Sequence, residues 1–194
     1  YQKAINLNLY HAGSHLRLGI LMANQGNLVP ALLSLNTFLT LEGNTDRAYA
    51  ALMIIQDLVQ AKYEPKTVVT TSYTGDIFKE IDVLINSKIS LNDKYKSKIK
   101  LRYPTTLQSQ LLLEKLEYVA KEKDFWMQTY VPFFKSVYDE NQFEPFAYNL
   151  LTSVNIEDAQ KWLKKNSTKL KDFGTWAVSV LNKQRSNATI VENG

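Results

Sequence analysis

The chain has 194 residues, of which 45% are hydrophobic and 22% are charged, so it can bury a core and is not a disordered polymer. Seven glycines and five prolines are few for a strand-rich sandwich, which favours an all-α fold. The absence of cysteine excludes disulfides, thiolate metal sites and a cysteine nucleophile.

The net charge is +4, and its excess lies in a basic strip, residues 94–102, which carries Lys94, Lys96, Lys98, Lys100 and Arg102 and no acid. On a helix these cations would scatter around the cylinder, so the strip does not predict a nucleic-acid partner. No run approaches the roughly 18 to 20 apolar residues that cross a bilayer. We therefore expect a soluble chain with no membrane-spanning segment.

The chain begins at Tyr1, already within a helical pattern. We interpret it as a processed or excised chain, in which a preceding targeting segment would not be visible. The compartment stays open, with the cell envelope or secretion slightly favoured over the cytoplasm.

Apolar residues recur at helical spacing along the first half of the chain. This spacing predicts a helix that ends near Gln25, a second that Asn27 caps and Gly43 stops, and further helices over 46–61 and 76–86. The β-branched segment 67–73 lies between Pro65 and Gly75, and we interpret it as a loop.

The basic strip alternates like a strand, yet Leu91, Tyr95, Ile99 and Arg102 also keep helical spacing. We favour a helix there. Pro104 ends it, and the pattern predicts further helices over 105–121, 124–140 with a bend at Pro132, 144–153, 156–165 and 168–184, followed by a frayed tail from Arg185.

The run from Ala12 to Thr45 contains small and apolar residues at the positions of a 34-residue helix–turn–helix unit: Leu18, Gly19, Met22, Gly26, Leu28, Ala31, Leu35 and Leu39. This run resembles a tetratricopeptide repeat (TPR). Gly19 and Ala31 would be small where two antiparallel helices approach most closely. The resemblance implies an all-α fold of stacked antiparallel hairpins in a TPR-like right-handed superhelix.

The resemblance is clear over residues 12–61 and degenerate elsewhere. His15 stands where the family has a bulkier residue, Phe38 replaces a small one, and Gly43 replaces the usual proline. We divide the chain into 1–66 (the repeat and the following helix), 67–104 (an irregular connection and a charged helix), 105–185 (degenerate hairpins) and 186–194 (the frayed tail). These parts are expected to form one continuous array.

His11 and His15 are the two histidines of the chain, four residues apart. That spacing suits a metal pair on a helix, but no third histidine and no adjacent glutamate completes the pattern. We interpret His15 as a packing residue and expect no metal and no cofactor. The glycines form no phosphate-binding loop, and no nucleophile elbow is present, so we do not expect an enzyme.

Nine aromatic residues gather between Phe125 and Tyr148. At helical spacing most of them are expected in the core. Trp126 and Tyr130, four apart and just before Pro132, are the two that we expect to be exposed, as possible ligand-binding aromatics. An exposed cluster of this kind would suit a cell-envelope carbohydrate- or small-ligand-binding protein, which is our alternative hypothesis.

Tetratricopeptide-like arrays receive a peptide or partner helix in a concave groove. The resemblance places that groove in this chain at Leu16, Ile20, Ala23, Asn24, Arg47 and Ala50. The groove would be largely apolar, with Asn24 and Arg47 orienting the partner. Our leading hypothesis is therefore a non-enzymatic scaffold or adaptor that binds another protein or peptide; the partner's identity and the oligomeric state stay open.

Overall fold

The computed structural model describes residues 1–67 and 76–192. Within these ranges every regular element is helical, and this confirms the all-α class. In chain order the elements are α1 (Gln2–Leu7), α2 (Ala12–Asn24), α3 (Leu28–Leu41), α4 (Asp46–Val59), α5 (Asp76–Asn86), the 3-10 turn η1 (Ile89–Leu91), α6 (Pro104–Lys115), α7 (Phe125–Thr129), α8 (Val131–Asp139), α9 (Phe143–Asn149), α10 (Glu157–Lys165) and α11 (Ser167–Glu192).

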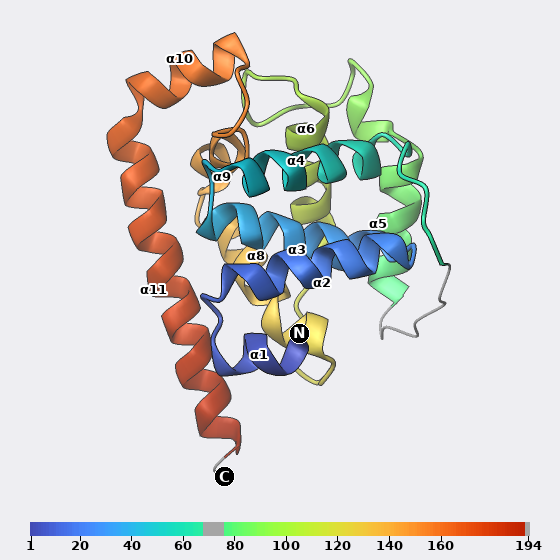
Figure 1. The fold of residues 1–194 in the computed structure, drawn as a ribbon, viewed down its shortest axis with the longest axis vertical. Coiled ribbons are helices and arrows are strands. Elements are labelled where there is room, and N and C mark those ends of the chain that lie inside the picture. The colour runs from blue at the N-terminus through green and yellow to red at the C-terminus, as the bar shows by residue number, and fades with distance from the viewer. Residues whose placement is uncertain (68–75, 193–194) are drawn as a thin grey trace.

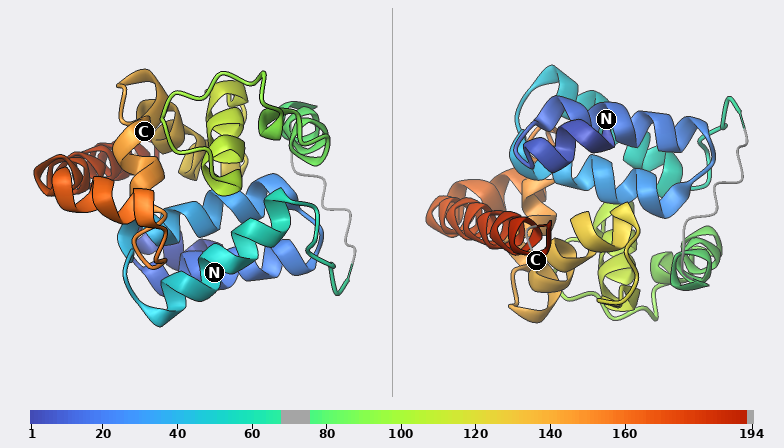
Figure 2. Two further views of the ribbon diagram at one scale, coloured as in Figure 1. Left: turned by 90° about the horizontal axis from the view of Figure 1, so that it is seen from above. Right: turned by 90° about the horizontal axis from the view of Figure 1, so that it is seen from below.

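The helices form two layers (Figures 1 and 2). One contains α2, α3 and α4 side by side, and the other contains α5, α6, α8 and α9, while α11 runs along one side of both. No helix among the described residues is long and apolar enough to cross a membrane.

Helix α3 lies in the centre and is buried on all sides from Leu28 to Leu39. Its sequence is apolar around the whole cylinder, which is typical of a core helix. Two of its polar residues are satisfied within the helix, because Ser34 Oγ donates to the Pro30 carbonyl and Thr37 Oγ1 to the Leu33 carbonyl, each over 2.9 Å. These two hydroxyls therefore do not oppose burial, whereas Asn36 of the same helix is fully buried with no hydrogen-bond partner for its side-chain amide within the described residues.

The α2–α3 hairpin has the close approach that the repeat-like spacing predicts. A Cβ atom added to Gly19 would lie 2.6 Å from Leu35 Cγ, so a glycine is needed where the helices meet. Ala31 is fully buried in the same hairpin, and Gly26 in the turn has a φ of +78°. The TPR-like superhelix beyond this hairpin stays a prediction.

Contacts between distant parts of the chain also hold the helices together. In a repeat array each unit contacts its neighbours, whereas here the Tyr10 hydroxyl lies 3.0 Å from the Val178 carbonyl of α11. Asn149 at the end of α9 donates to the Leu39 carbonyl of α3 over 3.0 Å. The two layers and α11 therefore share one core.

The basic strip is not the helix that we favoured. Residues 92–103 form turns, bends and irregular backbone, and side chains bind the backbone groups that a helix would use. Gln110 of α6 accepts from the Lys98 N–H over 2.8 Å and donates to the Lys96 carbonyl over 2.9 Å. Arg102 donates to the Tyr95 and Asn92 carbonyls. These bonds replace the helical ladder.

Several other boundaries differ from those predicted. The segment 124–140 forms two helices, α7 and α8, that separate at Tyr130, two residues before Pro132. Helix α6 ends at Lys115 rather than near 121, and α11 continues through the expected tail to Glu192. Of the loop predicted over 67–73, all but Thr67 lies outside the described residues.

Helix α3 begins after Asn27, as predicted, but the Asn27 side chain does not cap it. The carboxylate of Asp82 in α5 accepts the Val29 N–H over 3.0 Å instead. A carboxylate is well suited to this position, because the first amides of a helix are unpaired and carry partial positive charge. The cap of the central helix thus comes from the other layer.

Candidate functional site

The apolar residues of the predicted groove lie on α2 and α4, which are in contact. Leu16 and Ile20 are half-buried and pack against the core, and Ala50 is exposed. Ala23 is fully buried, so its placement in a groove is wrong: it faces the core. Of the predicted apolar set, Leu16, Ile20 and Ala50 therefore keep exposed surface, and the groove itself stays a prediction.

The two polar groove residues already have partners within the chain. Asn24 Oδ1 accepts from the Tyr63 hydroxyl over 2.9 Å. The Arg47 guanidinium donates to both carboxylate oxygens of Glu42. These bonds to Arg47, together with one from Thr45, hold the pKa of Glu42 below its usual value. A partner would have to compete for both side chains.

The expectation that Trp126 and Tyr130 are exposed is wrong, because both side chains enter the core. Trp126 is 6% exposed and Tyr130 is 1% exposed, and their rings stack with centroids 5.4 Å apart. Tyr130 also packs edge-to-face on Phe125 and bonds to His15 of α2. Most of the aromatic cluster is buried with them, as predicted: Phe133, Phe134, Phe143, Phe146 and Tyr148.

His15 is the buried packing residue that the sequence indicates. Its Nδ1 atom lies 2.9 Å from the Tyr130 hydroxyl and its Nε2 atom 3.0 Å from the Leu9 carbonyl. Burial lowers the pKa of His15 to about 4. Both ring nitrogens are therefore engaged, and within the described ranges no three His, Asp or Glu side chains gather in a way that could hold a metal ion.

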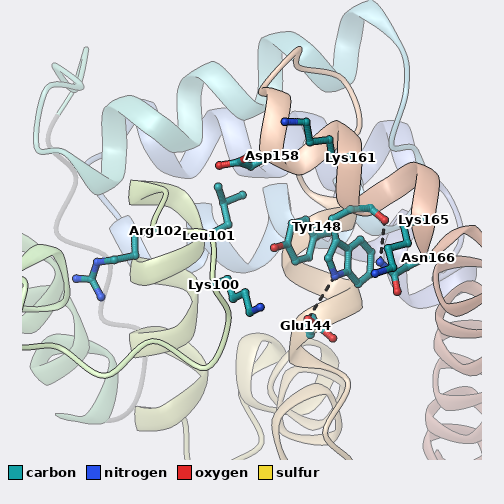
Figure 3. Close-up of a pocket in the computed structure, with 10 residues that line it drawn as sticks. Lys100, Leu101, Arg102, Glu144, Tyr148, Asp158, Lys161, Lys165 and Asn166 are labelled. Atoms are coloured by element: carbon teal, nitrogen blue, oxygen red, sulfur yellow. Dashed lines mark hydrogen bonds between the residues drawn. The ribbon is translucent and has the colours of Figure 1, made fainter.

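An open pocket of about 770 Å³ lies between the segment 100–102, α9 and α10 (Figure 3). It combines aromatic, cationic and carboxylate side chains, and we call it the α9–α10 pocket. Its lining residues are Lys100, Leu101, Arg102, Glu144, Tyr148, Asp158, Lys161, Trp162, Lys165 and Asn166.

Helical spacing explains why α9 and α10 line the pocket together. Glu144 and Tyr148 are four apart on α9, so they share a face of that helix. Asp158, Lys161, Trp162 and Lys165 recur at three- and four-residue steps on α10, which likewise places them on one face.

An aromatic pair forms part of the pocket lining. The rings of Tyr148 and Trp162 stack with centroids 4.0 Å apart and planes inclined by 1°. Trp162 Nε1 donates to Glu144 over 3.3 Å, and Asn166 Nδ2 donates to the Trp162 carbonyl over 2.9 Å. Tyr148 is buried, whereas Trp162 is half-exposed. The pair thus forms a fixed platform with one indole partly open to solvent.

Cations outnumber carboxylates around the platform. Lys100, Arg102, Lys161 and Lys165 line the pocket with Glu144 and Asp158. Glu144 is paired with Lys169 of α11, which offsets its charge. Burial, and next the charge of Glu144, raises the pKa of the Tyr148 hydroxyl. Tyr148 is therefore protonated at neutral pH and can donate a hydrogen bond.

Sequence patterns alone do not indicate this pocket. The basic strip and the aromatic cluster each supply part of its lining, namely Lys100, Arg102 and Tyr148. Trp162 lies outside both of these segments. The available signal was the spacing of Asp158, Lys161, Trp162 and Lys165, an aromatic residue among charged ones on a single helix face.

Comparison with family models, with curated proteins and with solved structures finds no significant match to this chain.

Proposed function

We propose that the chain is a non-enzymatic binding protein that holds a saccharide-type ligand in the α9–α10 pocket. The observation that carries the proposal is the Tyr148–Trp162 stack, with its partly exposed indole in the lining of an open pocket of about 770 Å³. This proposal develops the alternative hypothesis from the sequence, but uses different aromatic residues from the two expected there.

The chemistry of the lining supports a sugar ligand. The C–H groups on one face of a pyranose ring are electron-poor, so they pack favourably on the negative face of an indole. The hydroxyl groups around the ring need both donors and acceptors, which Lys100, Lys165 and Asp158 offer at the pocket wall. A pocket that pairs a rigid apolar platform with a few polar groups suits a small ligand.

Tryptophan fluorescence provides the test. Titration with a panel of neutral and acidic oligosaccharides should change the emission of the wild type in a saturable way. Trp162→Leu should lose this response. The matched control is Trp176→Leu on α11, where Trp176 bonds to Glu140 outside the pocket; this variant should retain it. A panel that leaves the wild-type emission unchanged would reject the proposal.

The second candidate is the protein-binding scaffold. Its support is the exposed surface of two helices in contact, α2 and α4, which we call the α2–α4 face: Leu16 and Ile20 on α2 are half-buried, and Ala50 and the 51% exposed Tyr49 lie on α4. Such a face can receive the apolar side of a partner helix. Immobilised wild-type protein and the immobilised Ile20→Glu variant should then recover different proteins from a lysate of the source cells. Circular dichroism of the two proteins checks that their helical content is the same. Identical recovery would argue against this face.

A further inference from the structure

We propose that the α9–α10 pocket selects acidic saccharides, with the ammonium groups of Lys100 and Lys165 binding the carboxylate of a uronic acid ring. This inference rests on the proposed function and adds the charge of the ligand to it. It concerns the same pocket, but it depends on residues other than the stacked rings.

The first step is that Lys100 and Lys165 approach the pocket from different elements. Lys100 belongs to the segment before α6, and Lys165 lies in the last turn of α10 (Figure 3). In the described part of the chain neither lysine has an ion-pair partner, whereas Lys161 pairs with Glu157. Two cations that line one pocket without a carboxylate partner can both contact an anion that enters it.

The second step concerns the two carboxylates of the pocket. Glu144 accepts from Trp162 and pairs with Lys169, so its charge is already offset. Asp158 has no ion pair within the described ranges and lies toward Lys161 in Figure 3. In the described part of the chain, the two lysines of the lining without an ion pair, Lys100 and Lys165, outnumber the one carboxylate without an ion pair, Asp158. The local field is therefore positive on balance, which favours a negatively charged ligand.

The third step is that the backbone of Lys100 is held in place before any ligand binds. Arg102 donates to the Asn92 and Tyr95 carbonyls over 2.9 and 3.0 Å. Gln110 binds the backbone of Lys96 and Lys98. Arg102 and Gln110 are thus positioning residues, because they fix the segment that presents Lys100 to the pocket. A fixed backbone lowers the entropy lost on binding.

The test compares two ligands with the same sugar rings, of which one is charged and the other neutral. A tetrasaccharide of α-1,4-linked galacturonate and its fully methyl-esterified form have the same rings and length, but the ester carries no charge. Isothermal titration at low salt should show the acid binding about tenfold or more tightly than the ester, the expected size for one hydrogen bond to a charged group. The advantage should shrink as salt is added.

Variants connect the preference to the two lysines. Lys100→Gln and Lys165→Gln should each reduce binding of the acid more than binding of the ester, because the glutamine amide can still donate to a sugar hydroxyl group but carries no charge. The control is Lys164→Gln, which removes an exposed charge from the same helix but does not line the pocket; it should keep the preference. An equal loss in the control would overturn the assignment to Lys100 and Lys165, because the acid would then respond to overall charge.

The outcomes separate this inference from the proposed function. If acid and ester bind equally, the inference is wrong while the saccharide pocket stands. If neither binds and Trp162 emission does not respond to any saccharide, both are wrong. A preference for the acid that both lysine substitutions abolish supports the inference directly.

Discussion

The Tyr130 hydroxyl lies 2.9 Å from Nδ1 of His15, although 115 residues separate the two in the chain. Because Nε2 lies 3.0 Å from the Leu9 carbonyl, the proton of the neutral ring is on Nε2 and Nδ1 accepts from Tyr130. The bond joins α2 to the junction of α7 and α8. It is thus a buried polar link between the two layers, and its energy depends on the charge of the imidazole.

This link predicts a loss of stability in acid. Burial lowers the pKa of His15 from 6.5 to about 4, so between these values the unfolded chain binds more protons than the folded one. The free energy of unfolding should therefore fall as pH drops from about 6.5 to about 4, with this group contributing about 3 kcal/mol in total. Urea unfolding at pH 7, 5.5 and 4 measures the effect.

His15→Gln provides the control for that measurement. Glutamine can bond to both partners but does not titrate, so the variant should lose less stability between pH 7 and 4 than the wild type. Equal losses in the two proteins would mean that other groups cause the acid sensitivity.

Gly19→Ala should destabilise the protein by about 1–3 kcal/mol, the usual cost of overpacking a core. The added Cβ would lie 2.6 Å from Leu35 Cγ, so the α2–α3 hairpin would have to separate. The matched control is Gly174→Ala in α11, where a Cβ would meet nothing within 4 Å. This control should be neutral or stabilising, because alanine favours an exposed helix. Thermal unfolding of the two variants compares them, and a stable Gly19→Ala would contradict the packing argument.

Local spacing predicted the features that depend on one or two adjacent helices. The close approach at Gly19 follows from small residues at fixed separations within one hairpin, and the helix over 76–86 follows from its apolar stripe. Both depend on residues that are near in sequence. His15 was predicted as a packing residue from its position in the repeat-like unit, although its partner Tyr130 lies 115 residues away in the chain.

Features that depend on long-range contacts could not be predicted in this way. The basic strip keeps helical spacing, but Gln110 of α6 binds its backbone and prevents the helix. Tyr130 is buried in contact with His15 of α2, which is far from it in the chain. The α9–α10 pocket needs Lys100 beside Tyr148 and Trp162, and nothing in the local pattern of any of the three indicates the other two.

Asp82→Ala should cost about 1–2 kcal/mol of stability, because it leaves the Val29 N–H at the start of the buried helix α3 without its carboxylate acceptor. Asp82→Asn should cost less, since the amide oxygen can still accept that hydrogen bond. Glu80→Gln, an exposed acidic position on the same helix, is the control and should be nearly neutral. Chemical unfolding distinguishes the three, and an Asp82→Ala variant as stable as Glu80→Gln would show that the cap contributes little.

Gln108 should be among the costliest positions to change, because its side chain serves three other elements from the middle of α6. Nε2 donates to the Val59 carbonyl over 3.0 Å and to the Ile85 carbonyl over 2.9 Å, while Oε1 accepts from the Ser90 hydroxyl over 2.7 Å. Both Gln108 and Ser90 are fully buried.

Gln108→Leu keeps most of the side-chain volume but leaves these three groups without their partner. At about 1–3 kcal/mol for each unsatisfied buried group, we expect a loss of about 3 kcal/mol or more. Ser90→Ala removes one bond and should cost about 1 kcal/mol. Urea unfolding of both single variants and of the double variant completes a cycle, in which the double variant should lose less than the sum because Ser90 needs no acceptor once it is alanine. Strict additivity would show that the Gln108–Ser90 bond carries no coupling energy.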